Sequence, residues 1–145
     1  MRILMINGPN LNLLGERETA IYGHKTLKDI EREVIDYAKP LGIDVIPYQS
    51  NLEGIIIDLL HYAHHENMDG VILNAAAYTH YSYAIYDAIK AITPPVVEVH
   101  LSDPSTREEA FRHTSVIKEA CVETFQGNHI DSYLAAVDFL EKHNV

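Results

Sequence analysis

Short apolar runs alternate with longer amphipathic stretches along most of the chain. The apolar runs are continuous, without a polar residue at every second position, which is typical of parallel strands covered on both faces by helices. We predict five strands, over Arg2–Asn7, Ile43–Tyr48, Gly70–Leu73, Val96–Val99 and Ala120–Phe125.

The amphipathic stretches between these runs predict helices. Asp29 follows Thr26 by three residues, which favours a capping box, and apolar residues then recur at helical spacing as far as Gly42. Further helices are predicted after the capping residue Asn51, over Tyr81–Ile92, as a short helix after Ser102 or Asp103 with Pro104 in its first turn, and after Asn128.

The order of these elements predicts the fold class. Five strand–helix units in 145 residues favour an α/β fold, a single flavodoxin-like doubly wound five-stranded parallel sheet with helices on both faces. No linker or repeat interrupts the chain, so we expect residues 1–145 to form one domain. The stretch Gly8–His24 has no predicted structure, and loops of this length are often lids. Ligands of such sheets bind beyond the carboxyl ends of the strands.

Composition and charge narrow the choice of ligand. The formal net charge of −10 argues against binding to nucleic acid or to an acidic membrane surface. A single cysteine, Cys121, excludes an internal disulfide, and its place in a predicted strand suggests a buried, inert thiol. The nine histidines lack tight metal-ligand spacing, and no apolar run is long enough to span a membrane. We expect a cytoplasmic protein in which the histidines do not form a metal site.

Polar residues follow three of the predicted strands. Neither a glycine motif that cradles phosphate nor a G-x-S-x-G nucleophile elbow is present. Amides and hydroxyls bind substrate hydroxyl groups, an Arg binds a carboxylate, and a His or Tyr moves protons. The pattern therefore indicates acid–base chemistry on a small, oxygen-rich molecule. The residues are Asn10, Arg17 and Tyr22 after the first strand, Asn74 and His80 after the third, and His100 and Ser102 after the fourth.

These segments resemble the type II 3-dehydroquinate dehydratase family in their order and spacing. The two longest matches are N-G-P-N-L-N-x-L-G at Asn7–Gly15 and V-V-E-V-H-L-S at Val96–Ser102. Shorter matches are Arg17-Glu18, Tyr22-Gly23, Gln49–Gly54, Asn74, Ala77–His80, Arg107-Glu108 and Phe111–His113.

The resemblance implies conversion of 3-dehydroquinate into 3-dehydroshikimate and water, a step of the shikimate pathway. It implies an anti elimination through an enolate, with no metal, cofactor or covalent intermediate. It implies that Tyr22 is the base beside the lid cation Arg17, and that His100, oriented by Glu98, is the acid. Asn10 would stabilise the enolate. A phenol is a weak base near neutral pH, and a neighbouring guanidinium favours its anion. The implied substrate-binding residues are Asn74, His80, Asp87, Leu101, Ser102 and Arg112.

The family relationship also implies a homododecamer, a tetramer of trimers, in which Asp87 reaches a neighbouring site. Some positions depart from the family pattern. Thr19 stands where a Pro is usual, which predicts a looser lid, and Ala76 stands where a Gly is usual. One extra residue near Ala110 would turn Arg112 by about 100° if that segment were helical.

Other functions are compatible with the same fold. A response-regulator receiver needs acidic residues where Asn7 and Asn74 stand, and a flavodoxin needs a hydroxyl-rich phosphate loop after the first strand. A catalytically inactive relative that binds a cyclic polyhydroxy acid as a sensor or scaffold stays open, although Tyr22 and His100 are both retained.

Single residues also have simpler interpretations. Arg107 and Arg112 could be solvated on a polar helix, and His80 could cap the helix that follows it. Tyr22 could anchor its loop, and His100 could be a buried histidine with its polar atoms satisfied.

Overall fold

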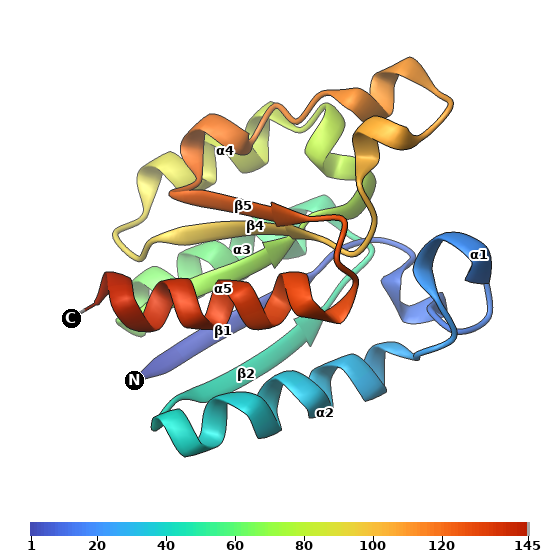
Figure 1. Cartoon of the computed structure of the whole chain (residues 1–145). Helices are drawn as coiled ribbons and strands as arrows, with labels where there is room; N and C mark the ends of the chain where they lie inside the picture. Colours follow the sequence, from blue (N-terminus) through green and yellow to red (C-terminus); the bar gives the residue numbers. More distant parts are fainter. Residues whose placement is uncertain (145) are drawn as a thin grey trace.

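The computed structural model describes residues 1–144 and shows one sheet of five strands (Figure 1). The strand order is β2-β1-β3-β4-β5, and each neighbouring pair is parallel. The predicted flavodoxin-like α/β fold is therefore confirmed. The strands are β1 (Arg2–Asn7), β2 (Asp44–Gln49), β3 (Gly70–Asn74), β4 (Val96–His100) and β5 (Glu123–Gln126).

Helices cover both faces of the sheet. They are α2 (Leu27–Ala38), α3 (Glu53–His65), α4 (Tyr83–Ala91) and α5 (Ile130–His143), whereas the single helical turn α1 (Thr19–Tyr22) lies in the loop after β1 (Figure 1). α2 and α5 lie on one face, and α3 and α4 lie on the other (Figure 1). Ile3 and Met5 of β1 belong to the core under α2 and α5, whereas Leu4 and Ile6 belong to the core under α3 and α4. This double burial explains why the run is apolar without alternation.

The helix starts agree only in part with the sequence predictions. The capping box is confirmed, because Thr26 Oγ1 accepts the Asp29 N–H at 3.1 Å and Asp29 Oδ2 accepts the Thr26 N–H at 3.0 Å. Asn51 does not cap α3, since its Oδ1 accepts the backbone N–H of Asn10 at 3.0 Å. α4 is capped by Ser82, whose Oγ accepts a backbone N–H of the first turn.

Two loops contain structure that the sequence pattern did not predict. The stretch after β1 forms a 3-10 turn, Leu11–Leu13, and the single helical turn α1. The short helix predicted after Asp103 is present as a 3-10 turn with Pro104 in its first turn and Asp103 as its cap, and two further 3-10 turns follow it, separated by extended residues. These turns are Pro104–Thr106, Ala110–His113 and Lys118–Ala120.

The last strand and helix begin later than predicted. β5 starts at Glu123 instead of Ala120, so Cys121 lies before the strand, where burial raises the pKa of its thiol. α5 follows His129, so the predicted cap at Asn128 is wrong. None of the helices formed by residues 1–144 has the length and apolar character of a membrane span.

The loops after β1 and β3 meet at the carboxyl edge of the sheet. Gly8 N donates to the carbonyl oxygen of Asn74 at 2.8 Å. A Cβ on Gly8 would lie 2.8 Å from the carbonyl oxygen of Ala75, so the close approach requires glycine. β1 and β3 are also in register there, with Asn7 opposite Asn74. The polar residues of both loops are thereby brought to one place.

Candidate active site

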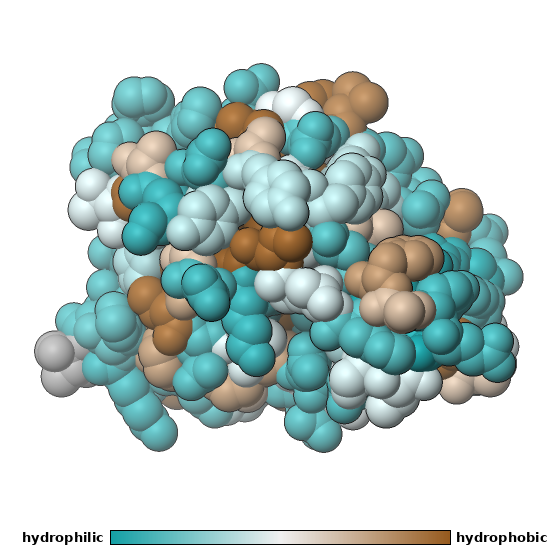
Figure 2. All heavy atoms as spheres, turned by 90° about the horizontal axis from the view of Figure 1, so that it is seen from above, coloured by the Kyte–Doolittle hydropathy of each residue, from teal (hydrophilic) through white to brown (hydrophobic). Residues whose placement is uncertain are grey.

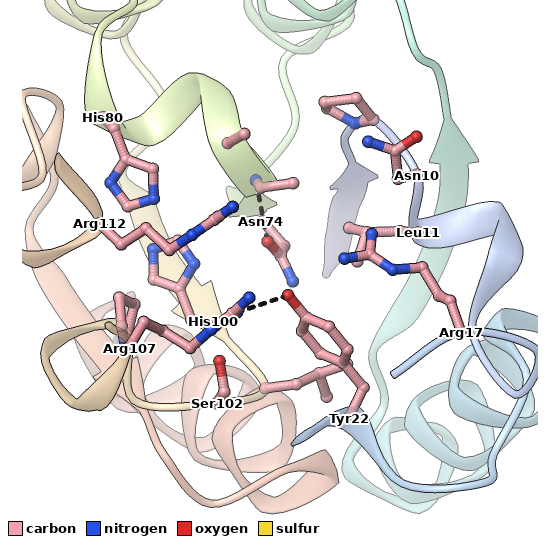
Figure 3. Close-up of a pocket in the computed structure, with 15 residues that line it drawn as sticks. Asn10, Leu11, Arg17, Tyr22, Asn74, His80, His100, Ser102, Arg107 and Arg112 are labelled. Atoms are coloured by element: carbon pink, nitrogen blue, oxygen red, sulfur yellow. Dashed lines mark hydrogen bonds between the residues drawn. The ribbon is translucent and has the colours of Figure 1, made fainter. Parts of the chain in front are cut away.

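A cavity of about 120 Å³ lies at this edge, between the loops that follow β1, β3 and β4 (Figure 3). It is the position that the parallel topology predicts for a ligand site. Its lining is rich in amide, hydroxyl, imidazole and guanidinium groups. The lining residues are Pro9, Asn10, Leu11, Arg17, Tyr22, Asn74, Ala76, Ala77, His80, His100, Leu101, Ser102, Pro104, Arg107 and Arg112.

Most of the residues predicted for the site lie at this cavity, with two exceptions. Glu98 is fully buried in β4 behind His100 and does not line the cavity. Asp87 is exposed on α4 and does not line it either. The residues that the structure brings together are Asn10, Arg17, Tyr22, Asn74, His80, His100, Leu101, Ser102 and Arg112.

The Tyr22 hydroxyl is bound by Arg107, an arginine for which solvation on a polar helix was one open interpretation. Nη1 of Arg107 donates to Tyr22 Oη at 2.8 Å (Figure 3). Burial alone would lower the pKa of Arg107, but the contacts with Tyr22 and Glu18 raise it, so the guanidinium stays charged. Arg107 is therefore a candidate site residue that the sequence interpretation missed. Its signal in the sequence was the Arg107-Glu108 match to the family pattern, to which no role was attached.

Arg17 approaches Tyr22 from a different direction. Its guanidinium carbon lies 4.9 Å from the centroid of the Tyr22 ring, and its Nη2 pairs with the carboxylate of Glu18. The hydrogen bond from Arg17 is the main cause of the lowered pKa of Glu18. Arg17 thus covers the ring face, as its expected place beside the base requires, while Arg107 holds the oxygen.

On the other side of the cavity, His100 is joined to a buried carboxylate. His100 is 7% exposed, and its Nε2 lies 2.7 Å from Oε2 of Glu98. The same oxygen accepts hydrogen bonds from Thr79 Oγ1 at 2.6 Å and Ser115 Oγ at 2.8 Å. Burial alone would raise the pKa of Glu98, but these donors and His100 hold it below its usual value. Glu98 is therefore ionised and orients the His100 ring.

The loop that carries Asn10 is held in place by side chains at the end of β2 and just beyond it. Asn10 has φ 69°, the left-handed region that asparagine tolerates better than most residues. Its backbone N–H donates to Asn51 Oδ1, and Gln49 Nε2 donates to the carbonyl oxygen of Gly8 at 3.1 Å. Gln49 and Asn51 therefore hold the site loop, and Asn51 does not cap α3.

Arg112 reaches the cavity despite the extra residue nearby. The expected rotation does not occur, because Ala110–His113 is a 3-10 turn flanked by extended residues. The guanidinium carbon of Arg112 lies 4.7 Å from the centroid of the Phe111 ring, and Nε of Arg112 donates to Glu109 Oε2 at 3.1 Å. The side chain is thereby fixed with its end at the cavity (Figure 3).

His80 does not cap α4, which is capped by Ser82 instead. Its Nδ1 lies 2.8 Å from the carbonyl oxygen of Thr114. Burial lowers the pKa of His80, and the nearby charges of His100 and Arg112 act in the same direction. A neutral His80 with Nδ1–H bound to the carbonyl presents Nε2 as an acceptor to the cavity.

The charge of the cavity is opposite to that of the whole chain. Arg17, Arg107 and Arg112 line it, and none of its lining residues is an Asp or Glu. The chain as a whole carries a net charge of −10. Among residues 1–144 no three His, Cys, Asp or Glu side chains are grouped so that they could hold a metal ion. The site therefore offers guanidinium cations that can bind an anionic group. It also offers a phenol and an imidazole that can transfer protons.

Comparison with known proteins gives consistent matches over nearly the whole chain. The family described as dehydroquinase class II matches residues 1–141. A 3-dehydroquinate dehydratase of Caldicellulosiruptor bescii is 50% identical over 97% of both chains. A catabolic 3-dehydroquinase of Debaryomyces hansenii is 46% identical over 95% of both. The crystal structure of a type II dehydroquinase from Butyrivibrio crossotus superposes with a TM-score of 0.94, at 44% identity and 97% coverage of both chains.

Proposed function

Because this chain belongs to the class II dehydroquinase family, we propose that it is a 3-dehydroquinate dehydratase, which converts 3-dehydroquinate into 3-dehydroshikimate and water. One observation carries this proposal. A tyrosine hydroxyl bound by a guanidinium and a histidine backed by a carboxylate line the same small cavity. An elimination of water needs such a pair, a base for one proton and an acid for the departing hydroxyl.

Tyr22 acts as the base in this proposal. As the tyrosinate it removes the proton from the carbon next to the ketone, and the electron pair of the C–H bond becomes an enolate. The guanidinium of Arg107, 2.8 Å from the phenolic oxygen, stabilises the tyrosinate, and Arg17 covers the ring. Asn10, which lines the cavity, stabilises the negative charge on the enolate oxygen.

His100 acts as the acid in the second step. The enolate collapses, the C–O bond breaks, and a proton from His100 leaves with the hydroxyl as water. Glu98 stays ionised under the hydrogen bonds of Thr79 and Ser115, so it stabilises a protonated His100. A proton that passes from Tyr22 to His100 through solvent restores both groups for the next turnover.

The remaining cavity residues bind the substrate in this proposal. Three arginines surround a cavity without lining carboxylates, which suits the carboxylate of 3-dehydroquinate. Amide, imidazole and hydroxyl groups suit its hydroxyls. The proposed binding residues are Asn74, His80, Leu101, Ser102 and Arg112, with the reaction itself requiring no cofactor.

We extend the proposal to the assembly and the pathway. The chain would act as one catalytic unit, residues 1–145, within the shikimate pathway and as a homododecamer. Asp87 is exposed on α4 and does not line the cavity of its own chain, so it would act only at the site of a neighbouring subunit. Exposed apolar side chains on the same side of the sheet support contact between copies, and Figure 2 shows brown and pale spheres on the face that carries α4. The exposed apolar side chains near the starts of α3 and α4 include Leu52, Ile55, Tyr81 and Tyr83.

Ultraviolet absorbance tests the proposed reaction directly, because the product contains a conjugated enone and the substrate does not. Purified protein with added 3-dehydroquinate should give a steady rise in absorbance. The rise should persist with a chelator and after borohydride treatment in the presence of substrate, since neither a metal nor a Schiff base takes part. Binding of 3-dehydroquinate without any rise in absorbance would contradict the proposal.

A further inference from the structure

Three buried polar side chains form a chain of hydrogen bonds behind the cavity. Tyr133 of α5 is fully buried, and its hydroxyl lies 2.6 Å from Oδ1 of Asn7 and 2.9 Å from Nδ2 of Asn74. Asn7 ends β1 and Asn74 ends β3, so the hydroxyl joins two neighbouring strands at the edge that carries the site. Of the three residues only Asn74 lines the cavity.

The direction of every hydrogen bond in this chain is fixed from one end. The backbone N of Ala76 lies 3.1 Å from Oδ1 of Asn74, and a backbone N–H can only donate. The Asn74 oxygen is therefore the acceptor of that bond, and its amide nitrogen faces Tyr133 as a donor. The Tyr133 hydroxyl accepts this bond, so its single proton goes to Asn7 Oδ1.

The tyrosine is well suited to hold this arrangement. Burial raises the pKa of Tyr133, so its hydroxyl keeps its proton across the range in which the enzyme would work. A flipped Asn74 amide would place its nitrogen against the N–H of Ala76 and its oxygen against a hydroxyl already committed to Asn7. The first contact would set two N–H donors against each other, and the second would lose its hydrogen bond. Both are costly in a buried site, where a polar group without a partner is destabilising.

We propose that Tyr133 is a positioning residue that holds the Asn74 amide with its NH₂ group committed to donation, so that Asn74 offers the cavity a hydrogen-bond donor. The Asn74 oxygen is occupied by Ala76, and one of its two amide protons is occupied by Tyr133. The second proton remains for an oxygen of the ligand. The proposal rests on the dehydratase function for its readout, and it adds a determinant of substrate binding from the opposite end of the sequence.

Tyr133→Phe tests the proposal, because it keeps the ring and removes only the hydroxyl. Loss of one positioned hydrogen bond weakens substrate binding by roughly tenfold. KM for 3-dehydroquinate should therefore rise on the order of tenfold, with kcat changed by less than about threefold, because Asn74 contacts the bound substrate and the transition state alike. Tyr37→Phe is the matched control. It removes a hydroxyl that also contacts α5, through Asp138 at 2.8 Å, but lies at the surface away from the cavity.

A double-mutant cycle separates positioning from a general effect on the fold. If Tyr133 acts through Asn74, Tyr133→Phe should raise KM in the natural chain but leave it unchanged in an Asn74→Ala background. Equal increases in both backgrounds, or an unchanged KM in the single variant, would overturn the proposal. Circular dichroism and the melting temperature establish that the variants are folded.

A second substitution keeps the test decisive if Tyr133→Phe does not fold. Asn7→Ala removes the acceptor of the tyrosine proton without touching the cavity, and it should raise KM in the same direction. An unchanged KM in folded Asn7→Ala would also count against the inference. Absence of turnover in the natural chain would instead refute the proposed function, so the two failures are distinguishable.

Discussion

Replacement of Arg107 by alanine tests whether a guanidinium activates the proposed base. Nη1 of Arg107 lies 2.8 Å from Tyr22 Oη, and the arginine side chain is 13% exposed. The guanidinium charge is delocalised, so its centre lies about 4 Å from the oxygen. Two opposite unit charges at that distance attract by about 1 kcal/mol in water and by about 4 kcal/mol at an effective dielectric constant of 20.

Because Arg107 is largely buried, removing it should cost an attraction to the tyrosinate in the upper part of this range. A loss of about 2 to 4 kcal/mol corresponds to a fall of roughly 30- to 900-fold in kcat/KM. Arg107→Lys keeps the charge but loses the planar group, so it should fall between the natural chain and the alanine variant.

Initial rates from enone absorbance over a range of 3-dehydroquinate concentrations measure this loss. Arg32→Ala is the matched control, because Arg32 is 71% exposed and its closest carboxylate oxygen, on Asp29, lies 3.9 Å away. It should leave kcat/KM unchanged. The electrostatic reasoning is refuted if folded Arg107→Ala keeps kcat/KM within about threefold of the natural chain.

Three further predictions concern stability, each measured as the free energy of unfolding in urea. Gly8→Ala should lower it by about 1 to 3 kcal/mol because a Cβ would overlap a carbonyl group, whereas Gly54→Ala, with open space around its Cβ on α3, should raise it by up to about 1 kcal/mol. Ala76 has φ 52°, so Ala76→Gly should raise the free energy of unfolding by about 1 kcal/mol, whereas the same change at exposed Ala84 in α4 should lower it. A change of the same sign at both positions would refute the strain argument. The pKa of Glu98 is lowered in the folded state, so its carboxylate contributes fully to the free energy of unfolding above its usual pKa of 4.5, and this contribution is lost as the pH falls through the lower folded pKa. Glu98→Gln should therefore make the free energy of unfolding fall less steeply with decreasing pH, and an unchanged slope would contradict the argument.

Much of the fold and the place of the site could be predicted because both depend on local patterns. Continuous apolar runs indicate a parallel sheet, and the parallel arrangement brings every strand end to one edge. Asn74 and His100 could be assigned to that edge from their positions after predicted strands. The positive φ of Ala76 was not predicted, and it gives a physical reason why a glycine is usual at this position.

The contact between Arg107 and Tyr22 could not be predicted in the same way. The two residues are 85 positions apart, and each lies in a loop whose path depends on tertiary contacts. The segment after β4 has no helical or strand periodicity to fix its direction. It is held instead by Ile117, which is fully buried in the core under α3 and α4, and by the bond from Val116 N to the carbonyl oxygen of Thr79 at 2.8 Å.

The extra residue near Ala110 shows why fixed points matter more than helical phase in such a segment. A rotation of about 100° per residue applies only to a continuous α-helix. Here Pro104–Thr106 holds one end of the segment and buried Ile117 holds the other, with extended residues between the turns. An added residue changes the path of the loop without turning all later side chains together. Arg107 and Arg112, one on each side of the addition, can therefore both reach the cavity.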